Sequence, residues 1–125
     1  MIHPFRKPAG FTLAELIVIM IILAIIVITA MAYYFNMVDE AELAAEKGVV
    51  GGVKSGIQTY VARNGAYPSA LDSAAIGVCD TSNPCFDGIL GQGGITRVWE
   101  KTGIYQYLSP TATVYTYNST SGVFQ

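Results

Sequence analysis

The sequence predicts an α+β protein: one long N-terminal α-helix, whose N-terminal half spans a membrane, packed on a small antiparallel β-sheet. Three observations predict this class. Residues 16–38 contain no charged side chain. Apolar residues recur at helical spacing between positions 49 and 61, and short alternating segments follow position 95. Only 13% of the chain is charged, against roughly 25% in average soluble domains, because the charge-free stretch dilutes the rest.

The first element is the apolar span. Residues 16–35 are nearly all Ile, Val, Leu, Met and Ala, and twenty helical residues at about 1.5 Å each cover about 30 Å, the thickness of a bilayer core. A cleavable secretory signal peptide is the alternative. Its apolar region is about 7–15 residues long and ends in a small-residue cleavage site, for which residues 29–32 are the nearest candidate. A buried core helix is disfavoured, because a remainder of about 90 residues cannot enclose a uniformly apolar helix of this length.

Charges at the two ends of the span predict its orientation. Arg6 and Lys7 precede it, whereas the acidic segment 39–46 follows it closely. Lys and Arg stay on the cytoplasmic side of a membrane. We therefore expect the N-terminus inside and the C-terminal body outside.

Glu15 lies at the head of the span, where a carboxylate is costly unless it has a partner. Two interpretations are open at this point. One is an ordinary charge at the helix N-terminus, at headgroup level, favoured by the helix dipole. The other is a specific pairing with a nearby cation.

The segment around Glu15 resembles a known family. Residues 10–16 read Gly-Phe-Thr-Leu-Ala-Glu-Leu, after a short basic leader and before the apolar span. This string resembles the prepilin processing site of type IV pilins and type II secretion pseudopilins. The resemblance implies cleavage after Gly10 by a prepilin peptidase and N-methylation of the new Phe11 amine. It also implies a filament in which Glu15 of one subunit pairs with the Phe11 amine of a neighbour.

The resemblance further implies a pilin-like fold in three parts: a basic prepilin leader at 1–10, a transmembrane and filament-core helix at 11–38, and an extracytoplasmic globular domain at 39–125. The implied partners are further copies in a helical filament, the prepilin peptidase and methyltransferase, an inner-membrane assembly platform, and the lipid bilayer before assembly. The implied location is the inner membrane, and after assembly an extracytoplasmic or cell-surface filament. Ala24 and Ala32 stand where many members carry Gly and Pro, so local unwinding of the span is not implied.

The helix is predicted to continue beyond the membrane, from about Thr12 to Arg63. Charged residues, Glu46 among them, are expected off its apolar face. Asn64-Gly65 predicts the helix end, with Gly in the left-handed cap. The glycines at 48, 51, 52 and 56 either soften this helix or let another backbone approach closely. Six apolar residues share one helical face: Val49, Val50, Val53, Ile57, Tyr60 and Val61.

Between the helix and the sheet lies a loop-rich segment. Residues 64–68, Asn-Gly-Ala-Tyr-Pro, again resemble pseudopilins and related small pilins. Residues 69–72 predict the capped start of a short helix that ends near position 75. Cys79 and Cys85 bracket a short polar loop, and outside the cytoplasm this pattern predicts a disulfide. A redox-active pair is disfavoured, because the spacing is not C-x-x-C and no βαβ pattern surrounds it.

The C-terminal part predicts short strands at 96–100, 104–108, 112–117 and 122–124. They would form an antiparallel sheet of three or four strands. Because an isolated hairpin is only marginally stable, we expect the sheet to lie against the apolar face of the helix. The turn before the last strand contains a glycosylation sequon at Asn118, which the turn itself explains.

Composition predicts neither a catalytic site nor a cofactor. The only histidine is His3, and two cysteines alone cannot build a structural zinc site. The net charge of −2 disfavours nucleic-acid binding, and the four tyrosines between 105 and 117 are expected to pack in the sheet. No metal site is expected either, since EF-hand spacing is lacking among the candidate acids Asp72, Asp80, Asp87 and Glu100.

We therefore interpret the chain as a structural subunit of a type IV pilus-like filament, not an enzyme. The short body and residues 64–68 favour a pseudopilin of a type II secretion system. The alternative is a surface type IV pilin acting in adhesion, motility or DNA uptake. Two further alternatives are a secreted domain behind a signal peptide and a membrane-anchored monomer that never polymerises.

Overall fold

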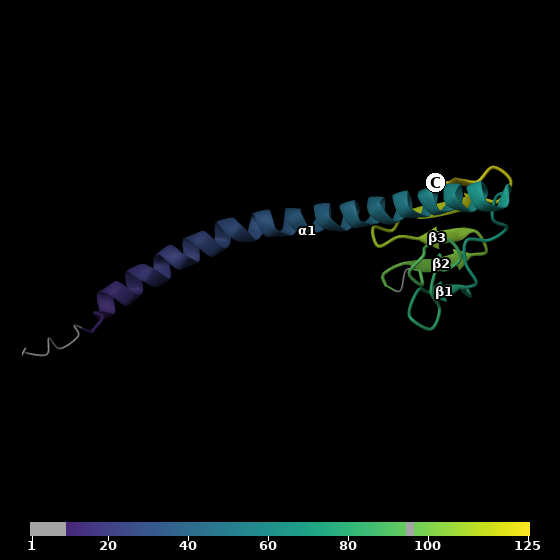
Figure 1. Ribbon diagram of the computed structural model, residues 1–125. Coiled ribbons are helices and arrows are strands. Elements are labelled where there is room, and N and C mark those ends of the chain that lie inside the picture. The colour runs from purple at the N-terminus through teal and green to yellow at the C-terminus, as the bar shows by residue number, and fades with distance from the viewer. Residues whose placement is uncertain (1–9, 95–96) are drawn as a thin grey trace, which may run out of the picture. The chain divides into compact units, whose positions relative to one another are not determined.

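The computed structural model describes residues 10–94 and 97–125. It divides into two compact units, one ending at Asp39 and one from Glu40 to Gln125. The elements follow one another as one helix and then five strands (Figure 1): α1 (Leu13–Asn64), β1 (Gly77–Val78), β2 (Glu100–Gly103), β3 (Gln106–Leu108), β4 (Val114–Asn118) and β5 (Val123–Phe124).

Helix α1 confirms the predicted single helix to within one residue at each end. At its C-terminal end Gly65 has a φ of 73° and donates its N–H to the carbonyl of Val61 at 2.8 Å. The Asn64 side chain donates to the carbonyl of Tyr60 at 3.0 Å. These bonds satisfy carbonyls that the ending helix leaves open, and glycine accepts the left-handed conformation without strain. The Asn-Gly stop signal is thus confirmed.

The sheet is an antiparallel meander in the order β1-β2-β3-β4-β5, so it has one strand more than the three or four expected. Lys101, Tyr107 and Tyr115 lie opposite one another across β2, β3 and β4. The sequence did not predict β1, because two residues are too short for a period-2 pattern to be visible.

The first predicted strand, 96–100, is wrong in position. The strand runs from Glu100 to Gly103, and Thr96 lies outside the described residues. Val98 has a φ of 73°, a left-handed conformation that interrupts an extended strand before Trp99. The next predicted strand, 104–108, begins too early, since Ile104 and Tyr105 form the turn between β2 and β3.

The predicted short helix at 69–75 is also wrong, because no helix is present in that segment. Asp72 was expected to serve a local helix start, but it and the following Ser73 both bind partners far away in the chain. The Asp72 carboxylate accepts from the Phe86 N–H at 3.0 Å, and the Ser73 N–H donates to Asp87 at 3.0 Å. Tertiary bonds therefore replace the local ones that a helix would need.

The core of the second unit lies between the C-terminal part of α1 and the sheet. Val53 and Ile57, on the predicted apolar face, are fully buried. Phe86 packs on Tyr107 with ring centroids 4.3 Å apart. The remaining core side chains come from the loops and the strands: Leu71, Cys79, Cys85, Trp99, Tyr117 and Phe124.

The helix glycines divide between the two roles considered for them. A Cβ at Gly56 would lie 2.7 Å from the Ile89 carbonyl oxygen, so this glycine lets the loop backbone approach the helix closely. Gly52 faces the Leu90 side chain at an ordinary contact distance. Gly48 and Gly51 have open space around them, so they only weaken the helix.

Candidate functional site

Gly10 and Phe11 precede the first turn of α1 in non-helical backbone. Phe11 is 77% exposed, and a side chain at Gly10 would meet no atom within 4 Å. A peptidase must bind a substrate chain in an accessible, non-helical form, because a helix hides its peptide groups in hydrogen bonds. The bond between these two residues has that accessibility.

Thr12 and Glu15 form a reciprocal cap at the start of α1. The Thr12 hydroxyl oxygen accepts the Glu15 N–H at 3.3 Å, and the Thr12 N–H donates to Glu15 Oε2 at 3.3 Å. This arrangement is the capping box, and its Thr-x-x-Glu pattern is visible in the sequence at positions 12–15. The structure thus gives Glu15 a local role at the helix terminus. Of the described residues, none donates to its second oxygen, Oε1.

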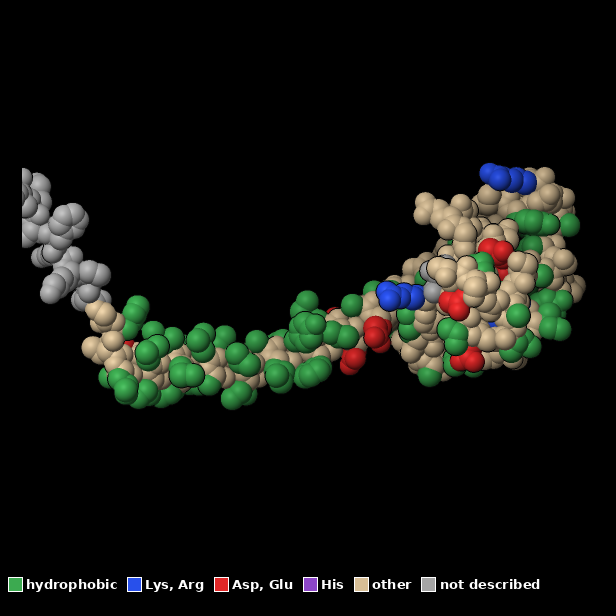
Figure 2. Space-filling view, turned by 90° about the horizontal axis from the view of Figure 1, so that it is seen from below, with side chains coloured by type: hydrophobic (Ala, Val, Ile, Leu, Met, Phe, Trp, Pro, Cys, Tyr) green, Lys and Arg blue, Asp and Glu red, His purple; other side chains and the backbone are tan. Residues whose placement is uncertain are grey.

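The segment of α1 from Leu13 to Val38 exposes every side chain. Figure 2 shows hydrophobic side chains along this segment. The helix is long and apolar enough to cross a membrane, and none of its most apolar window is buried, which excludes the buried-core alternative for the described chain. The one hydroxyl in its middle, on Thr29, donates to the carbonyl of Ile26 at 2.9 Å, so it needs no external partner.

The disulfide predicted from the sequence is present in the globular unit. Cys79 and Cys85 are bonded, fully buried, and 5.4 Å apart between Cα atoms. Asp80 closes the enclosed loop by accepting from the N–H groups of Ser82 and Asn83, each at 2.8 Å. These bonds, with that from the Ser82 hydroxyl foremost, lower the pKa of Asp80 below its ordinary value. The burial of both cysteines is consistent with the structural bridge that the sequence predicts.

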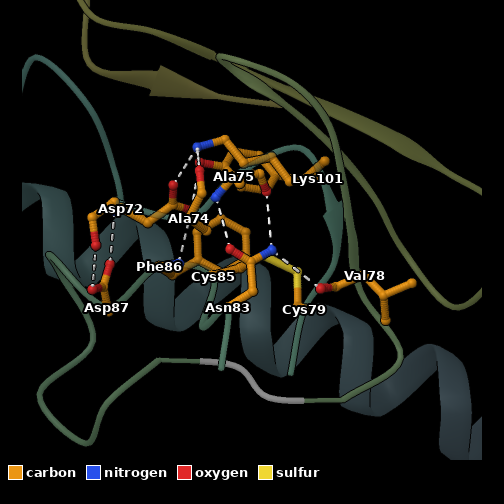
Figure 3. A network of polar contacts seen from close by, with 12 residues as sticks. Asp72, Ala74, Ala75, Val78, Cys79, Asn83, Cys85, Phe86, Asp87 and Lys101 are labelled. Atoms are coloured by element: carbon orange, nitrogen blue, oxygen red, sulfur yellow. Dashed lines mark hydrogen bonds and ion pairs between the residues drawn. A yellow bond between two sulfur atoms is a disulfide. The ribbon is translucent and has the colours of Figure 1, made fainter. Parts of the chain in front are cut away.

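The side chain of Asn83 extends this loop toward β1 (Figure 3). Its amide nitrogen donates to the carbonyls of Ala75 and Val78, and its oxygen accepts the Ala75 N–H at 2.7 Å. Strand β1 is at the edge of the sheet, where open backbone groups invite pairing with other chains. Asn83 occupies one of those groups, the Val78 carbonyl, and its two bonds to Ala75 hold the segment directly before β1.

A buried ion pair joins the loop after α1 to the sheet (Figure 3). Lys101 Nζ lies 2.5 Å from Asp72 Oδ1, and their side chains are 7% and 0% exposed. Lys101 also donates to the Ala74 carbonyl, and the Tyr107 hydroxyl donates to Asp72 at 2.8 Å. Burial raises the pKa of Tyr107, and its bond to Asp72 raises that pKa further, so the phenol stays neutral. Sequence reasoning missed this pair because its members lie far apart in the chain.

Glu46 was expected off the apolar face of α1, and this is wrong. Its side chain is buried, and it accepts from the Tyr115 hydroxyl at 2.6 Å and from the Thr111 hydroxyl. Burial raises the pKa of Glu46, but these bonds outweigh it, so the pKa lies below its ordinary value. The signal was available, because positions 46, 50, 53 and 57 are spaced by four, three and four, the period of one helix face.

The candidate metal ligands are dispersed or engaged elsewhere. Asp72 binds Lys101, Asp80 closes the cystine loop, and Asp87 binds Ser73. Within residues 10–94 and 97–125, no group of three His, Cys, Asp or Glu side chains is placed to hold a metal ion.

Three of the four tyrosines expected to pack in the sheet do so. Tyr107 and Tyr117 are buried, Tyr115 packs against the core, and the Tyr117 hydroxyl donates to the Pro68 carbonyl at 2.7 Å. Tyr105 instead lies in the turn between β2 and β3 and is exposed. Asn118 accepts the Thr120 N–H at 2.9 Å, which makes its sequon part of the turn before β5.

Comparison with known proteins places these features in context. A family profile described as the prokaryotic N-terminal methylation motif matches residues 5–31. Fimbrial protein EcpC of Eikenella corrodens is 31% identical over 101 residues, 76% of this chain but only 65% of that protein, less than two thirds of it. Type II secretion system core protein G of Pseudomonas aeruginosa is 30% identical over 111 residues, 84% of this chain and 76% of that protein. No solved structure matches the chain.

Proposed function

Because the chain belongs to the family of type IV pilins and type II secretion pseudopilins, which are structural subunits of pilus-like filaments, we propose a specific path for its maturation. The precursor inserts into the membrane through residues 11–38. A prepilin peptidase removes the leader, residues 1–10, and the new amine of Phe11 is methylated. The subunit then polymerises through its N-terminal helix, with residues 39–125 as the extracytoplasmic domain.

The observation that carries this proposal is the exposed apolar part of α1, most of which lies within the methylation motif at residues 5–31. Exposing apolar surface to water costs about 25 cal/mol per Å². Every side chain from Leu13 to Val38 is exposed in the single chain. These side chains therefore require lipid before assembly and other copies of the chain afterwards.

Glu15 has a second role in this proposal. An ionised carboxylate within the apolar environment of a filament core costs several kcal/mol unless a cation pairs with it. The Phe11 amine of a neighbouring subunit is such a cation, and it exists only after cleavage. Processing would thus create the partner of Glu15 and couple maturation to assembly.

The orientation and location follow from the flanking charges. Arg6 and Lys7 precede the span and the acidic segment 39–46 follows it, which favours an N-terminus inside the cytoplasm. In this proposal the subunit waits in the inner membrane, meets the peptidase and an assembly platform there, and ends in an extracytoplasmic filament.

Between the two kinds of filament, a secretion pseudopilin is favoured. Its support is the match to core protein G over 76% of that protein, together with the Asn-Gly-x-Tyr-Pro string at 64–68. The second candidate, a surface type IV pilus subunit, is supported by the match to the fimbrial protein. Filaments that are absent from the cell surface unless the subunit is overproduced would favour the first candidate.

Intact mass of the subunit purified from its source, together with filament microscopy, tests the proposal. We expect a chain that begins at Phe11 and carries one added methyl group. The variant Gly10→Leu should keep its leader, whereas Gly48→Leu, at an exposed glycine with open space around it, should be processed normally. A mature chain that begins near Ala32 would instead establish the signal-peptide alternative.

A further inference from the structure

Three consecutive aromatic residues end the apolar part of α1: Tyr33, Tyr34 and Phe35. Their side chains are 75%, 66% and 62% exposed. Successive helical residues are turned by about 100°, so three in a row spread over about 200° of the helix circumference. A contact stripe for one neighbouring helix would instead recur at every third or fourth residue. This aromatic girdle therefore fits a medium that encircles the helix at one depth.

The girdle lies one hydrocarbon thickness from the start of the helix. Tyr33 follows Leu13, the first helical residue, by twenty positions, which corresponds to about 30 Å along the axis. The hydrocarbon core of a bilayer is about 30 Å thick. The polar cap formed by Thr12 and Glu15 and the girdle are thus spaced to reach the two interfaces of one membrane.

The polar groups of the interior of the span differ from those at its end. The Thr29 hydroxyl, in the interior, is satisfied by the carbonyls of Ile25 and Ile26. Among the described residues, the hydroxyls of Tyr33 and Tyr34 have no protein partner. Rings with a polar tip prefer the boundary between hydrocarbon and water, where the ring is covered and the hydroxyl finds an acceptor.

From these observations we propose that the girdle binds the phospholipid headgroup layer of the extracytoplasmic leaflet and sets the depth at which the subunit is held before assembly. The ester carbonyls and phosphates of the lipid accept hydrogen bonds from the tyrosine hydroxyls, and the rings cover the upper acyl chains. The inference rests on the membrane-inserted stage of the proposed function, and it assigns these three residues to lipid and not to a neighbouring subunit at that stage.

Depth-dependent fluorescence quenching tests this assignment. The full-length chain, reconstituted in vesicles of phosphatidylcholine and phosphatidylglycerol, would carry Tyr34→Trp in the girdle or Leu23→Trp at mid-span. Lipids brominated near the headgroup should quench Tyr34→Trp more than lipids brominated deep in the chain, and the order should reverse for Leu23→Trp. The native Trp99 is 2% exposed within the globular unit and supplies an unquenched background.

Two outcomes separate this inference from the proposed function. If Leu23→Trp is quenched by deep bromines but Tyr34→Trp is quenched best by the same deep lipids, or by none, the girdle assignment alone is overturned. If neither reporter is quenched, the span is not in the bilayer and the membrane-inserted stage fails as well. Neither measurement requires filament formation.

A substitution series tests whether the girdle sets the depth. Replacing Tyr33, Tyr34 and Phe35 together by Leu keeps the segment apolar but removes its interfacial preference. The depth profile of the Leu23→Trp reporter should then broaden and shift. The matched control changes Ile25, Ile26 and Val27 to Leu and should leave that profile unchanged. An unchanged profile in the girdle variant would show that other residues hold the span in place.

Discussion

The part of α1 before Asp39 and the part after it differ in where their apolar side chains find cover. Up to Val38 every side chain is exposed, whereas Val53 and Ile57 in the second part are buried against the sheet of the same chain. The first part is apolar all round, and the second carries an apolar stripe among charged residues. A uniformly apolar helix must be covered on all sides by lipid or other subunits, but a striped helix needs only one layer of its own chain.

The comparison teaches that one helix can depend on two kinds of partner. Substitutions in the first part should affect membrane insertion and assembly and leave the stability of the globular unit unchanged. Substitutions in the second unit should do the reverse. The following variants test that separation.

The largest effect is expected from Glu15→Ala. The variant should insert and be cleaved, because the span and Gly10 are unchanged, but filament yield should fall by more than about tenfold, since losing a pairing worth several kcal/mol exceeds the 1.4 kcal/mol of one decade. Glu15→Gln should be nearly as poor, because it keeps the shape and loses the charge. The measurement is sheared filament against membrane-retained subunit, with Glu42→Gln as the exposed acidic control.

Wild-type filament yield from both Glu15 variants would show that this residue acts only through its cap with Thr12. The pairing with a neighbour's amine would then have to be abandoned. The difference in burial between the two parts of α1 would be unaffected by that result.

The next effect concerns the buried ion pair of the globular unit. Lys101→Met leaves the Asp72 carboxylate buried without its cation and should lower the free energy of unfolding by about 3–5 kcal/mol. Adding Asp72→Leu should recover part of this loss, because the second change removes the buried charge. Thermal unfolding of the full chain in detergent, followed by near-UV circular dichroism, measures both, and Glu100→Gln on the exposed face is the control. A loss below about 1 kcal/mol for Lys101→Met would mean that water reaches the carboxylate.

The disulfide is expected to contribute less. Replacing Cys79 and Cys85 by Ser should lower the free energy of unfolding by about 2 kcal/mol, since a short loop restricts the unfolded chain only modestly. In the unfolded, non-reduced wild type, a thiol assay should find no free cysteine. Two reactive thiols in protein from an oxidising compartment would contradict the bridge, and membrane insertion should be the same for both proteins.

A smaller effect is expected at the helix start. Thr12→Val removes the hydroxyl that accepts the Glu15 N–H and should weaken the first turn by about 1 kcal/mol, whereas Thr12→Ser keeps the cap. Amide hydrogen exchange at Leu13 to Glu15 in micelles measures the change, with cleavage checked in parallel. Equal protection in the Thr12→Val and Thr12→Ser variants would show that the Thr12 hydroxyl does not stabilise the first turn.

The smallest effect is a pH dependence. The folded pKa of Glu46 lies below its ordinary value of 4.5, so its bonds stabilise the globular unit above that pH and are lost as the pH falls through the folded pKa. Between those two values wild type should lose stability more steeply than Glu46→Gln. Parallel curves of unfolding free energy against pH for the two proteins would show that Glu46 does not cause this dependence. The control Glu42→Gln, at an exposed position of the same helix, should follow wild type.

The features predicted from sequence share one property, which is that their signals are local. Hydropathy over residues 16–35 indicated the span, and Asn64-Gly65 indicated where α1 ends, because capping depends on neighbouring residues only. The disulfide followed from two cysteines six positions apart. In contrast, the expected helix at 69–75 and the expected strand at 96–100 were wrong, since long-range bonds of Asp72 and the left-handed Val98 overrode local propensity.

By itself the sequence determined the apolar span, the position of the prepilin-like string 10–16 at its start, the continuous helix and the approximate place of the sheet. These depend on composition and on spacings of a few residues. Only the tertiary structure decided that Asp72 meets Lys101, that Glu46 accepts a hydrogen bond from Tyr115, and that Asn83 binds the carbonyls of Ala75 and Val78. A buried polar group must find its partner wherever the packed chain brings one, and in a single sequence the pairing of Glu46 with Tyr115, 69 positions apart, leaves no periodic signal.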